Sequence, residues 1–309
     1  MTITFNRVFI VGAGAMGAAY GSMFHDMDPA CVSFVAKGER AERIKEKGLV
    51  VNDRPYVFPV VSPGENAPPP DLIMVAVKNH HLPQAVEDMR DLVGERSVIL
   101  SVMNGIESEE QLGAALGVEK VLYAVAVGID AVREGHAVTY SKRGKLYFGE
   151  ARNATLTERV KALHDLFSRA GIVSEIPEDM IRTLWWKFMI NVGINQASAV
   201  LQAPYGVFQT LPEAGDLMES AMKEVILLAE AYNIDLSQKD IQEWLAFLSS
   251  LAPTGKTSML QDVEGARKTE VEIFSGKVIS LGKGWGVPTP VNETLYRILK
   301  VMEQRLTLS

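Results

Sequence analysis

With 309 residues and a formal net charge of −7, the chain is long enough for about two domains and too acidic for a broad nucleic-acid or anionic-membrane surface. Its 47% apolar and 22% charged residues are ordinary for a globular protein with a sizeable core. The single cysteine, Cys31, excludes an internal disulfide, and no signal-peptide pattern or membrane-length apolar run is present, so we expect a cytoplasmic protein.

The first half of the chain alternates short apolar strands with helices. The expected strands cover residues 5–11, 31–36, 71–77, 97–102 and 121–127. The expected helices between them cover residues 16–27, 39–47 and 82–92. Because the strands lack an inside–outside alternation, they indicate a parallel sheet covered on both faces, which is the doubly wound α/β fold of Rossmann type. Residues 136–149 are expected to form an antiparallel edge hairpin with its turn at 141–144.

After about residue 177 the pattern becomes almost wholly helical. The expected helices cover residues 179–201, 211–232, 238–251, 258–281 and 290–304. This change predicts a domain boundary near residues 176–178. The chain would then consist of a dinucleotide-binding domain over 1–177 and an all-α substrate-binding and catalytic domain over 178–309.

A glycine motif of the form G-x-G-x-x-G directly follows the first expected strand and opens a helix. The motif is Gly12-Ala13-Gly14-Ala15-Met16-Gly17. Gly12 permits the tight turn, Gly14 lets a pyrophosphate approach the backbone, and Gly17 lets the helix pack against the strand. The free N–H groups and the positive dipole end of the helix would face the phosphates. The motif predicts a bound dinucleotide, and a glycine-rich turn without a ligand is the alternative.

The residues after the second strand bear on the choice between NAD and NADP. An NAD enzyme usually carries an acid there that holds the ribose hydroxyls. This chain has Lys37 at that place and Arg40 one turn later. Because cations suit a 2′-phosphate, we expect NADP(H) as the cofactor. The alternative is that both cations are solvated surface charges, and Glu39 between them weakens the cofactor interpretation.

Three polar residues interrupt the apolar helix expected over 179–201. Lys187, Asn191 and Asn195 lie at i, i+4 and i+8, which stacks them along one stripe of the helix. A buried lysine is costly unless it has a partner or a function. The stripe is therefore either a catalytic and binding surface or a structural lysine paired with a carboxylate.

Further polar candidates lie at the ends of expected elements. Ser258 precedes a helix and has Gln261 three residues later, so it is either an N-cap or a ligand-binding residue, and Glu270 would follow on the same helix. Lys78 and Asn104 each follow a parallel strand, where ligands bind in such folds, although loop capping is the alternative. The five histidines show no metal-ligand spacing, so no metal site is expected.

Together these motifs resemble the ketopantoate reductase (2-dehydropantoate 2-reductase) family nearly end to end. The matching segments are VGAGAMG at 11–17, VAVK at 75–78, MNG at 103–105, WWKFMINVGIN at 185–195, SMLQD at 258–262, KTEVEIFSG at 268–276 and GVPTPVNETLY at 286–296. The resemblance implies a dinucleotide domain followed by a helical domain, with the active site in the cleft between them. It also implies NADPH-dependent reduction of ketopantoate to pantoate, on the route to pantothenate and coenzyme A.

By position, the resemblance implies roles for single residues. Lys187 matches the catalytic lysine of the family, whose ammonium would stabilise the charge that develops on the ketone oxygen and deliver the proton. Glu270 matches the active-site glutamate and would orient Lys187 or bond a substrate hydroxyl. Ser258 matches the serine near the substrate carboxylate. Lys78 and Asn104 match residues at the junction of cofactor and substrate.

Asn191 and Asn195 match the substrate-binding asparagines of the family, but two positions depart from its pattern. The family often has arginine where Lys37 stands, and asparagine where this chain has Tyr205. Tyr205 leaves open a reductase for a different small 2-oxo or β-hydroxy acid. A catalytically silent NADP(H)-sensing protein is the alternative from another class. The expected partner is a small keto acid, and the chain itself is expected to be a monomer or homodimer.

Overall fold

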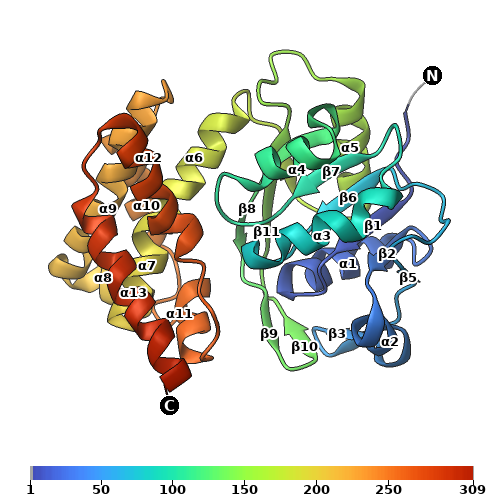
Figure 1. Ribbon diagram of the computed structural model, residues 1–309, viewed down its shortest axis with the longest axis horizontal. Helices are drawn as coiled ribbons and strands as arrows, with labels where there is room; N and C mark the ends of the chain where they lie inside the picture. The colour runs from blue at the N-terminus through green and yellow to red at the C-terminus, as the bar shows by residue number, and fades with distance from the viewer. Residues whose placement is uncertain (1–2, 309) are drawn as a thin grey trace. The chain divides into compact units, whose positions relative to one another are not determined.

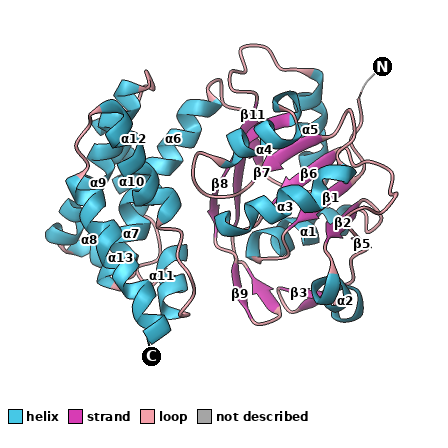
Figure 2. Cartoon of the chain, in the orientation of Figure 1, coloured by secondary structure: helices cyan, strands magenta, loops and turns pink. Residues whose placement is uncertain are grey.

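The computed structural model describes residues 3–308, and the chain divides after Thr183 into two compact units. Unit 1 (Met1–Thr183) contains all the strands that the structure describes, whereas unit 2 (Leu184–Ser309) is helical (Figure 1, Figure 2). This confirms the expected fold class, a Rossmann-type α/β domain followed by an all-α domain. The boundary expected after residue 177 lies a few residues before the division. Within residues 3–308, no helix has the length and apolar character needed to cross a membrane.

Unit 1 is built on an eight-stranded sheet of order β12-β11-β8-β7-β6-β1-β2-β5. Its strands are β1 (Val8–Val11), β2 (Val32–Val35), β5 (Val60–Val61), β6 (Leu72–Val75), β7 (Val98–Ser101), β8 (Val121–Ile129), β11 (Arg143–Gly149) and β12 (Ser174–Glu175). The strands from β8 to β5 pair in parallel, and β11 runs antiparallel to β8. The five strands expected in the first half of the chain are therefore all present.

Helices cover both faces of this sheet. They are α1 (Ala15–Met27), α2 (Gly38–Lys47), α3 (Leu82–Met89), α4 (Ser108–Leu116) and α5 (Glu158–Arg169), with 3-10 turns at Asn79–His81, Arg90–Leu92 and Val118–Lys120. In β1, Ile10 packs into the core shared with α1 and α5, whereas Phe9 packs into the core shared with α3 and α4. Both faces of the strand are buried, which is why its sequence shows no alternation.

A second, four-stranded sheet of order β4-β3-β10-β9 lies beside the main sheet in unit 1 (Figure 1). Its strands are β3 (Leu49–Val51), β4 (Arg54–Tyr56), β9 (Val132–Glu134) and β10 (Ala137–Thr139). β10 pairs antiparallel with β9 and parallel with β3. The second sheet therefore joins the segment after α2 to a hairpin that follows β8.

The hairpin expected over residues 136–149 is wrong, because β10 does not pair with β11 and β11 pairs with β8 instead. The physical reason is the carboxylate of Asp130 at the end of β8. Its Oδ1 accepts hydrogen bonds from the backbone N–H groups of Ser141 at 2.8 Å and Lys142 at 2.7 Å. These bonds tie the residues expected as a turn to the end of β8, so β11 returns along that strand.

Unit 2 consists of helices and two π-helical turns. The helices are α6 (Met180–Ile190), which begins in unit 1, α7 (Gln196–Leu201), α8 (Tyr205–Thr210), α9 (Pro212–Ala231), α10 (Gln238–Ser249), α11 (Ser258–Glu264), α12 (Lys277–Trp285) and α13 (Pro290–Leu308). The first π turn, Asn191–Asn195, joins α6 to α7, and the second π turn, Glu272–Gly276, leads into α12. Such turns are rare and frequently occur at functional sites.

The single helix expected over residues 258–281 is wrong, because α11 ends at Glu264. Ala266 has a φ of 49°, a left-handed conformation that a continuing α-helix does not contain. Arg267 then folds back onto α11, where its Nε donates to Oδ1 of Asp262 at 3.0 Å. Ser258 and Glu270 therefore lie on different elements.

Glu109 is a buried acid in α4, only 5% exposed. Its Oε2 accepts a hydrogen bond from Ser108 Oγ at 2.9 Å, and Ser108 Oγ lies 2.8 Å from Ser101 Oγ. Burial nevertheless raises the pKa of Glu109 from 4.5 to about 7. The folded protein thus binds this proton more tightly than the unfolded chain. The contribution of Glu109 to stability is full below about pH 4.5 and is lost as the pH rises through about 7.

We therefore expect Glu109→Gln to stabilise the protein at pH 8 by up to about 3 kcal/mol, and to change its stability little at pH 5. Thermal unfolding at the two pH values measures both effects. The exposed neighbour Glu110 provides the matched control, since Glu110→Gln should be neutral at either pH. An equal effect of Glu109→Gln at pH 5 and pH 8 would contradict the pKa assignment.

Candidate active site

The glycine loop, residues 12–17, follows β1, and its three glycines have different surroundings. Gly12 has a φ of +110°, and an added Cβ would lie 2.5 Å from the carbonyl oxygen of Ala76. A Cβ on Gly17 would lie 1.8 Å from the carbonyl oxygen of Gly12. A Cβ on Gly14 would meet only the Ala76 oxygen, at an ordinary 3.9 Å. Packing within the protein therefore requires Gly12 and Gly17, whereas the space at Gly14 is open to a ligand.

The start of α1 also fits a phosphate group. Gly14 is the N-cap residue of α1, and no side chain caps the helix there. The first N–H groups of a helix need an acceptor, and together with the helix dipole they favour an anion. Open space at Gly14 and an uncapped helix N-terminus are what the pyrophosphate of a dinucleotide requires.

Three loops of unit 1 meet at one edge of the main sheet. β1, β6 and β7 are parallel neighbours, in which Val11 is aligned with Val75 and Val75 with Ser101. The glycine loop, Lys78 and Asn104 come shortly after the ends of these strands. The grouping expected from the sequence is thus present, with both side chains at the sheet edge that carries the glycine loop.

The two cations expected at a 2′-phosphate have different surroundings. Lys37 lies directly before α2, and its Nζ forms an ion pair with Oδ1 of Asp88 on α3 at 2.6 Å. Arg40 is exposed in the first turn of α2, and within residues 3–308 it has no ion pair. A residue that the sequence did not single out, Arg133 of β9, donates from Nη1 to the carbonyl oxygen of Ala13.

In unit 2, the polar stripe runs along α6 into the first π turn. Lys187 is in α6, and Asn191 and Asn195 are the first and last residues of the π turn. The turn packs tightly on α9, since a Cβ on Gly193 would lie 2.5 Å from Cε of Met222. Sequence spacing placed the three residues on one stripe but gave no indication of the π turn.

The charge of Lys187 has no carboxylate partner among the residues that the structure describes. Lys187 is partly buried, and desolvation lowers its pKa from 10.5 to about 8. Within residues 3–308, no acid lies within ion-pair distance of its ammonium. The structure thus gives no support to the interpretation of Lys187 as the partner of a structural ion pair.

Asn195 adds a second polar group without a protein partner. It is 7% exposed, and in the part of the chain that the structure describes its side-chain amide makes no hydrogen bond. Its amide atoms are not among the fully buried polar atoms that lack a partner, so solvent or a ligand can reach them. Lys187 and Asn195 are therefore the strongest candidates in unit 2 for groups that bind a polar molecule.

A buried hydrogen-bond network connects the two π turns, and the sequence gave no indication of it. Oε1 of Gln196, which follows the first turn, accepts from the backbone N–H of Ser275 in the second at 3.0 Å. Nε2 of Gln196 donates to Oδ1 of Asn292 at 3.2 Å, and Nδ2 of Asn292 donates to Oε2 of Glu224 at 2.7 Å. The network fixes the two irregular turns relative to each other within unit 2.

The cap of α11 is Thr257, so the alternative interpretation of Ser258 as the N-cap is wrong. Oγ1 of Thr257 accepts a hydrogen bond from the N–H of Leu260 at 3.1 Å. Thr257 is 2% exposed, whereas the next residue, Ser258, is exposed in the first turn of the helix. Within residues 3–308 the hydroxyl of Ser258 makes no hydrogen bond, so it remains available to a ligand.

Glu270 is 7% exposed and lies just before the second π turn. Its neighbour Thr269 anchors the backbone, because both N–H and Oγ1 of Thr269 donate to Oε1 of Glu303, at 2.8 and 2.6 Å. Lys300 holds Glu303 in turn, at 2.8 Å. The carboxylate of Glu270 is therefore presented from a firmly anchored segment.

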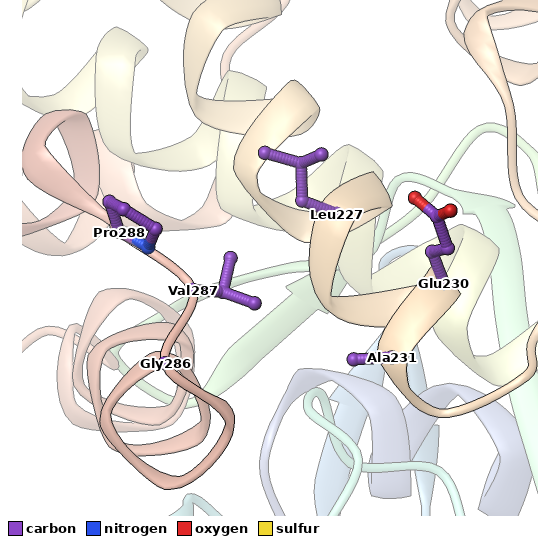
Figure 3. A pocket seen from close by; sticks show the side chains of 6 residues that line it. All are labelled: Leu227, Glu230, Ala231, Gly286, Val287 and Pro288. Carbon is purple, nitrogen blue, oxygen red and sulfur yellow. The ribbon is translucent and has the colours of Figure 1, made fainter.

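Two surface hollows of unit 2 contain none of these candidates. The first is lined mainly by apolar side chains, with Glu230 the one charged member (Figure 3). Its lining residues are Leu227, Glu230, Ala231, Gly286, Val287 and Pro288. The second is lined by residues between Leu201 and Leu217. Neither hollow is centred on the polar stripe, so neither marks the candidate site.

Comparison with known proteins identifies the family. Residues 8–153 match the family described as Ketopantoate reductase PanE/ApbA, and residues 179–303 match Ketopantoate reductase PanE/ApbA C terminal. The chain belongs to the ketopantoate reductase family. This is a family of NAD(P)-dependent oxidoreductases that act on CH–OH groups.

Known relatives align with this chain over nearly the whole of its length. It is 26% identical over 302 residues to 2-dehydropantoate 2-reductase of Aquifex aeolicus, which covers 96% of this chain and 97% of the relative. The structure of 2-dehydropantoate 2-reductase from Geobacter metallireducens has a TM-score of 0.84 at 28% identity, covering 95% and 99% of the two chains. A D-mandelate dehydrogenase with NADH and anilino(oxo)acetate has a TM-score of 0.88 at 24% identity, covering 97% and 99%, and shows the fold alone.

Tyr205, the position expected from the sequence to depart from the family pattern, lies beside the segment that leads to Ser258. Its backbone N–H donates to the carbonyl oxygen of Gly255 at 2.9 Å, and that of Gly206 donates to Pro253 at 2.8 Å. The ring packs on Gly255, where an added Cβ would lie 2.8 Å from Cδ2. Burial raises the pKa of Tyr205, so its phenol stays protonated at neutral pH.

Proposed function

We propose that this chain reduces ketopantoate to pantoate with NADPH, in the biosynthesis of pantothenate and coenzyme A. The observation that carries the proposal is Lys187, a partly desolvated ammonium that has no carboxylate partner within residues 3–308. On the same polar stripe, the amide of Asn195 makes no hydrogen bond to the described residues. Membership of the family supplies the reaction class. The glycine loop of unit 1 supplies a place for the dinucleotide.

When bound, NADPH would supply the hydride that reaches the ketone carbon. The electron pair of the carbonyl double bond moves to its oxygen, where the ammonium of Lys187 stabilises the charge and donates a proton. Solvent then returns a proton to the neutral amine of Lys187. With a pKa of about 8, Lys187 can both give and regain this proton near neutral pH.

The remaining candidates would orient the keto acid. Asn191 and Asn195 offer amide donors and acceptors to the hydroxyl group of the substrate, and Ser258 offers its exposed hydroxyl to the carboxylate. Glu270 would accept a hydrogen bond from the substrate hydroxyl, since the structure shows no contact by which it would orient Lys187 within residues 3–308. Lys78 and Asn104, at the sheet edge that carries the glycine loop, would contact the cofactor and the substrate carboxylate.

The choice of NADP(H) over NAD(H) is part of the proposal. No acidic residue stands directly after β2, and cations at that position suit a 2′-phosphate better than free ribose hydroxyls. The fold alone does not decide the choice, because the mandelate dehydrogenase of the same fold is described with NADH.

The deciding experiment follows the absorbance of NADPH while the full chain is given ketopantoate or an unbranched acid such as 2-oxobutanoate. We expect kcat/KM to be at least about a hundredfold higher for ketopantoate than for 2-oxobutanoate. The hydroxyl group of ketopantoate would bond to polar groups of the site that 2-oxobutanoate leaves unpaired. A preference for the unbranched acid would overturn the assignment of the substrate.

The same assay addresses two other functions. Tyr205, beside the Ser258 segment, favours as second candidate a reductase for a different small 2-oxo or β-hydroxy acid. That function predicts turnover of a 2-oxo or β-hydroxy acid other than ketopantoate. A silent NADP(H)-sensing protein predicts cofactor binding without turnover of any 2-oxo acid.

Ser258 and Thr257 form a matched pair for testing carboxylate recognition. We expect Ser258→Ala to raise KM for the keto acid about tenfold or more, because a hydrogen bond to a charged group is lost, and to leave thermal stability unchanged. Thr257→Ala removes the cap of α11 and should cost about 1 kcal/mol of stability. Steady-state kinetics and thermal unfolding of both variants separate the roles. Unchanged KM in Ser258→Ala would remove this residue from the site.

A further inference from the structure

The β9–β10 hairpin of unit 1 brings an arginine onto the glycine loop. Nη1 of Arg133 donates to the carbonyl oxygen of Ala13, and its Nε donates to the carbonyl oxygen of Gly135 at 3.1 Å. A guanidinium has five N–H donors, so three remain after these two bonds. Arg133 therefore presents an unsatisfied, half-buried cation beside the loop that would hold the pyrophosphate.

Two further arginines lie close to Arg133. Arg40 and Arg43 are three residues apart on α2, which places them on the same face of the helix. Arg133 lies on β9, which pairs with β10. β10 also pairs with β3, the strand that follows α2 (Figure 1). Burial and the positive charges of Arg43 and Arg40 lower the pKa of Arg133. The second sheet thus brings together three cations from distant parts of the sequence.

In the described part of the chain, no carboxylate forms an ion pair with this cluster of three arginines. Within residues 3–308, none of the three arginines forms an ion pair, although Glu39 and Glu42 lie next to Arg40 and Arg43 on α2. Five other arginines of unit 1 form ion pairs, whereas Arg7, Arg96 and Arg143 form none within residues 3–308. The paired arginines are Arg54, Arg90, Arg152, Arg159 and Arg169. Cations held together without a counterion repel one another, and a bound anion would relieve that repulsion.

The position of the cluster indicates which anion it would bind. In this fold the pyrophosphate lies on the glycine loop, and the residue after β2 reaches the adenosine ribose. Arg133 bonds to the first of these segments, and Arg40 and Arg43 follow the second. Lys37, the residue after β2 itself, is held by Asp88. Guanidinium groups bind phosphate through two parallel hydrogen bonds, which an ammonium cannot form.

We propose that Arg133, with Arg40 and Arg43, binds the 2′-phosphate of NADPH, and that Arg133 is a determinant of cofactor specificity in this chain. The inference takes one element from the proposed function, namely that the dinucleotide bound by this chain is NADPH. Arg133 lies about a hundred residues after the position at which sequence motifs locate the 2′-phosphate site.

The test measures binding to the full chain without catalysis, by calorimetric titration with 2′,5′-ADP and with 5′-ADP. We expect the unmodified protein to bind 2′,5′-ADP more tightly. Arg133→Gln should weaken binding of 2′,5′-ADP about tenfold or more, and binding of 5′-ADP about threefold at most, because a charge-assisted contact to one phosphate is lost. The exposed Arg96 of the same unit, which has no ion pair within residues 3–308, provides the control, and Arg96→Gln should change neither value.

Two outcomes would overturn the proposal. Equal weakening of both ligands would mean that Arg133 only orders the glycine loop, and no weakening would mean that the cluster faces solvent. Arg43→Gln, an exposed change on α2 that leaves the bond to Ala13 intact, is expected to lower 2′,5′-ADP affinity severalfold and decides the question if Arg133→Gln does not fold. Failure to bind either ligand or NADPH would instead contradict the proposed function.

Discussion

Lys187→Met is expected to lower kcat by about a hundredfold to ten-thousandfold, the range for loss of a general acid. Methionine keeps the length of the side chain and removes its charge. Because the structure gives Lys187 no carboxylate partner within residues 3–308, the change leaves no buried acid uncompensated. The variant should therefore be at least as stable as the unmodified protein, because desolvation disfavours the lysine charge in the folded state, whereas breaking a buried ion pair costs about 3–5 kcal/mol.

The pH dependence of kcat provides an independent test of the same group. Desolvation lowers the pKa of Lys187 to about 8, so its ammonium loses the proton as the pH rises through that value. A general acid acts only in its protonated form, and we expect ketone reduction to slow above about pH 8. The Lys187→Met variant should lack this limb of the profile.

The control for Lys187 is Lys283, an exposed lysine of α12 for which Lys283→Met should leave kcat unchanged. Circular dichroism and NADPH titration establish that each variant is folded and binds the cofactor. A folded Lys187→Met protein that retains nearly the kcat of the unmodified chain would exclude Lys187 as the proton donor.

The sequence predicted those parts of the fold that depend on local patterns. The strands of the main sheet were recognisable because both of their faces are buried, which leaves continuous apolar runs. The hairpin over 136–149 was misassigned because the side chain of Asp130 redirects the chain, and such a bond depends on tertiary position. The π turns were missed because their sequences have the same polar spacing as an α-helix.

The candidate site also contains residues that local sequence patterns predict and residues that only the folded structure brings together. The glycine loop was predictable, since its residues are adjacent in the sequence and Gly12 and Gly17 are each required by close contacts within the protein. Thr257 and Ser258 both have the chemistry of an N-cap, and only the structure distinguishes the buried cap from the exposed hydroxyl. Arg133 could not be found from spacing, because only the pairing of β10 with β3 brings it to α2 and the glycine loop.

Gly14→Ala and Gly17→Ala add the same methyl group to the same loop, and we expect opposite results. A Cβ on Gly14 meets nothing in the protein closer than 3.9 Å, and its φ of −80° is open to any residue. Gly14→Ala should therefore unfold at the same or a slightly higher temperature, since alanine reduces the entropy of the unfolded chain. The methyl group would occupy the place of the pyrophosphate, so NADPH should bind at least about tenfold more weakly.

Gly17→Ala should instead destabilise the protein by about 1–3 kcal/mol or more, because its Cβ would lie 1.8 Å from the carbonyl oxygen of Gly12 and the backbone must shift. Thermal unfolding and a fluorescence titration with NADPH, performed on both variants, give the two readings. If Gly14→Ala binds NADPH as the unmodified chain does, the open space at Gly14 is not the pyrophosphate site. If Gly17→Ala is fully stable, the tight contact of α1 with β1 is not what requires glycine. Opposite effects on stability and on NADPH binding are expected because Gly17 lies against the backbone of the loop, whereas Gly14 would lie against the ligand.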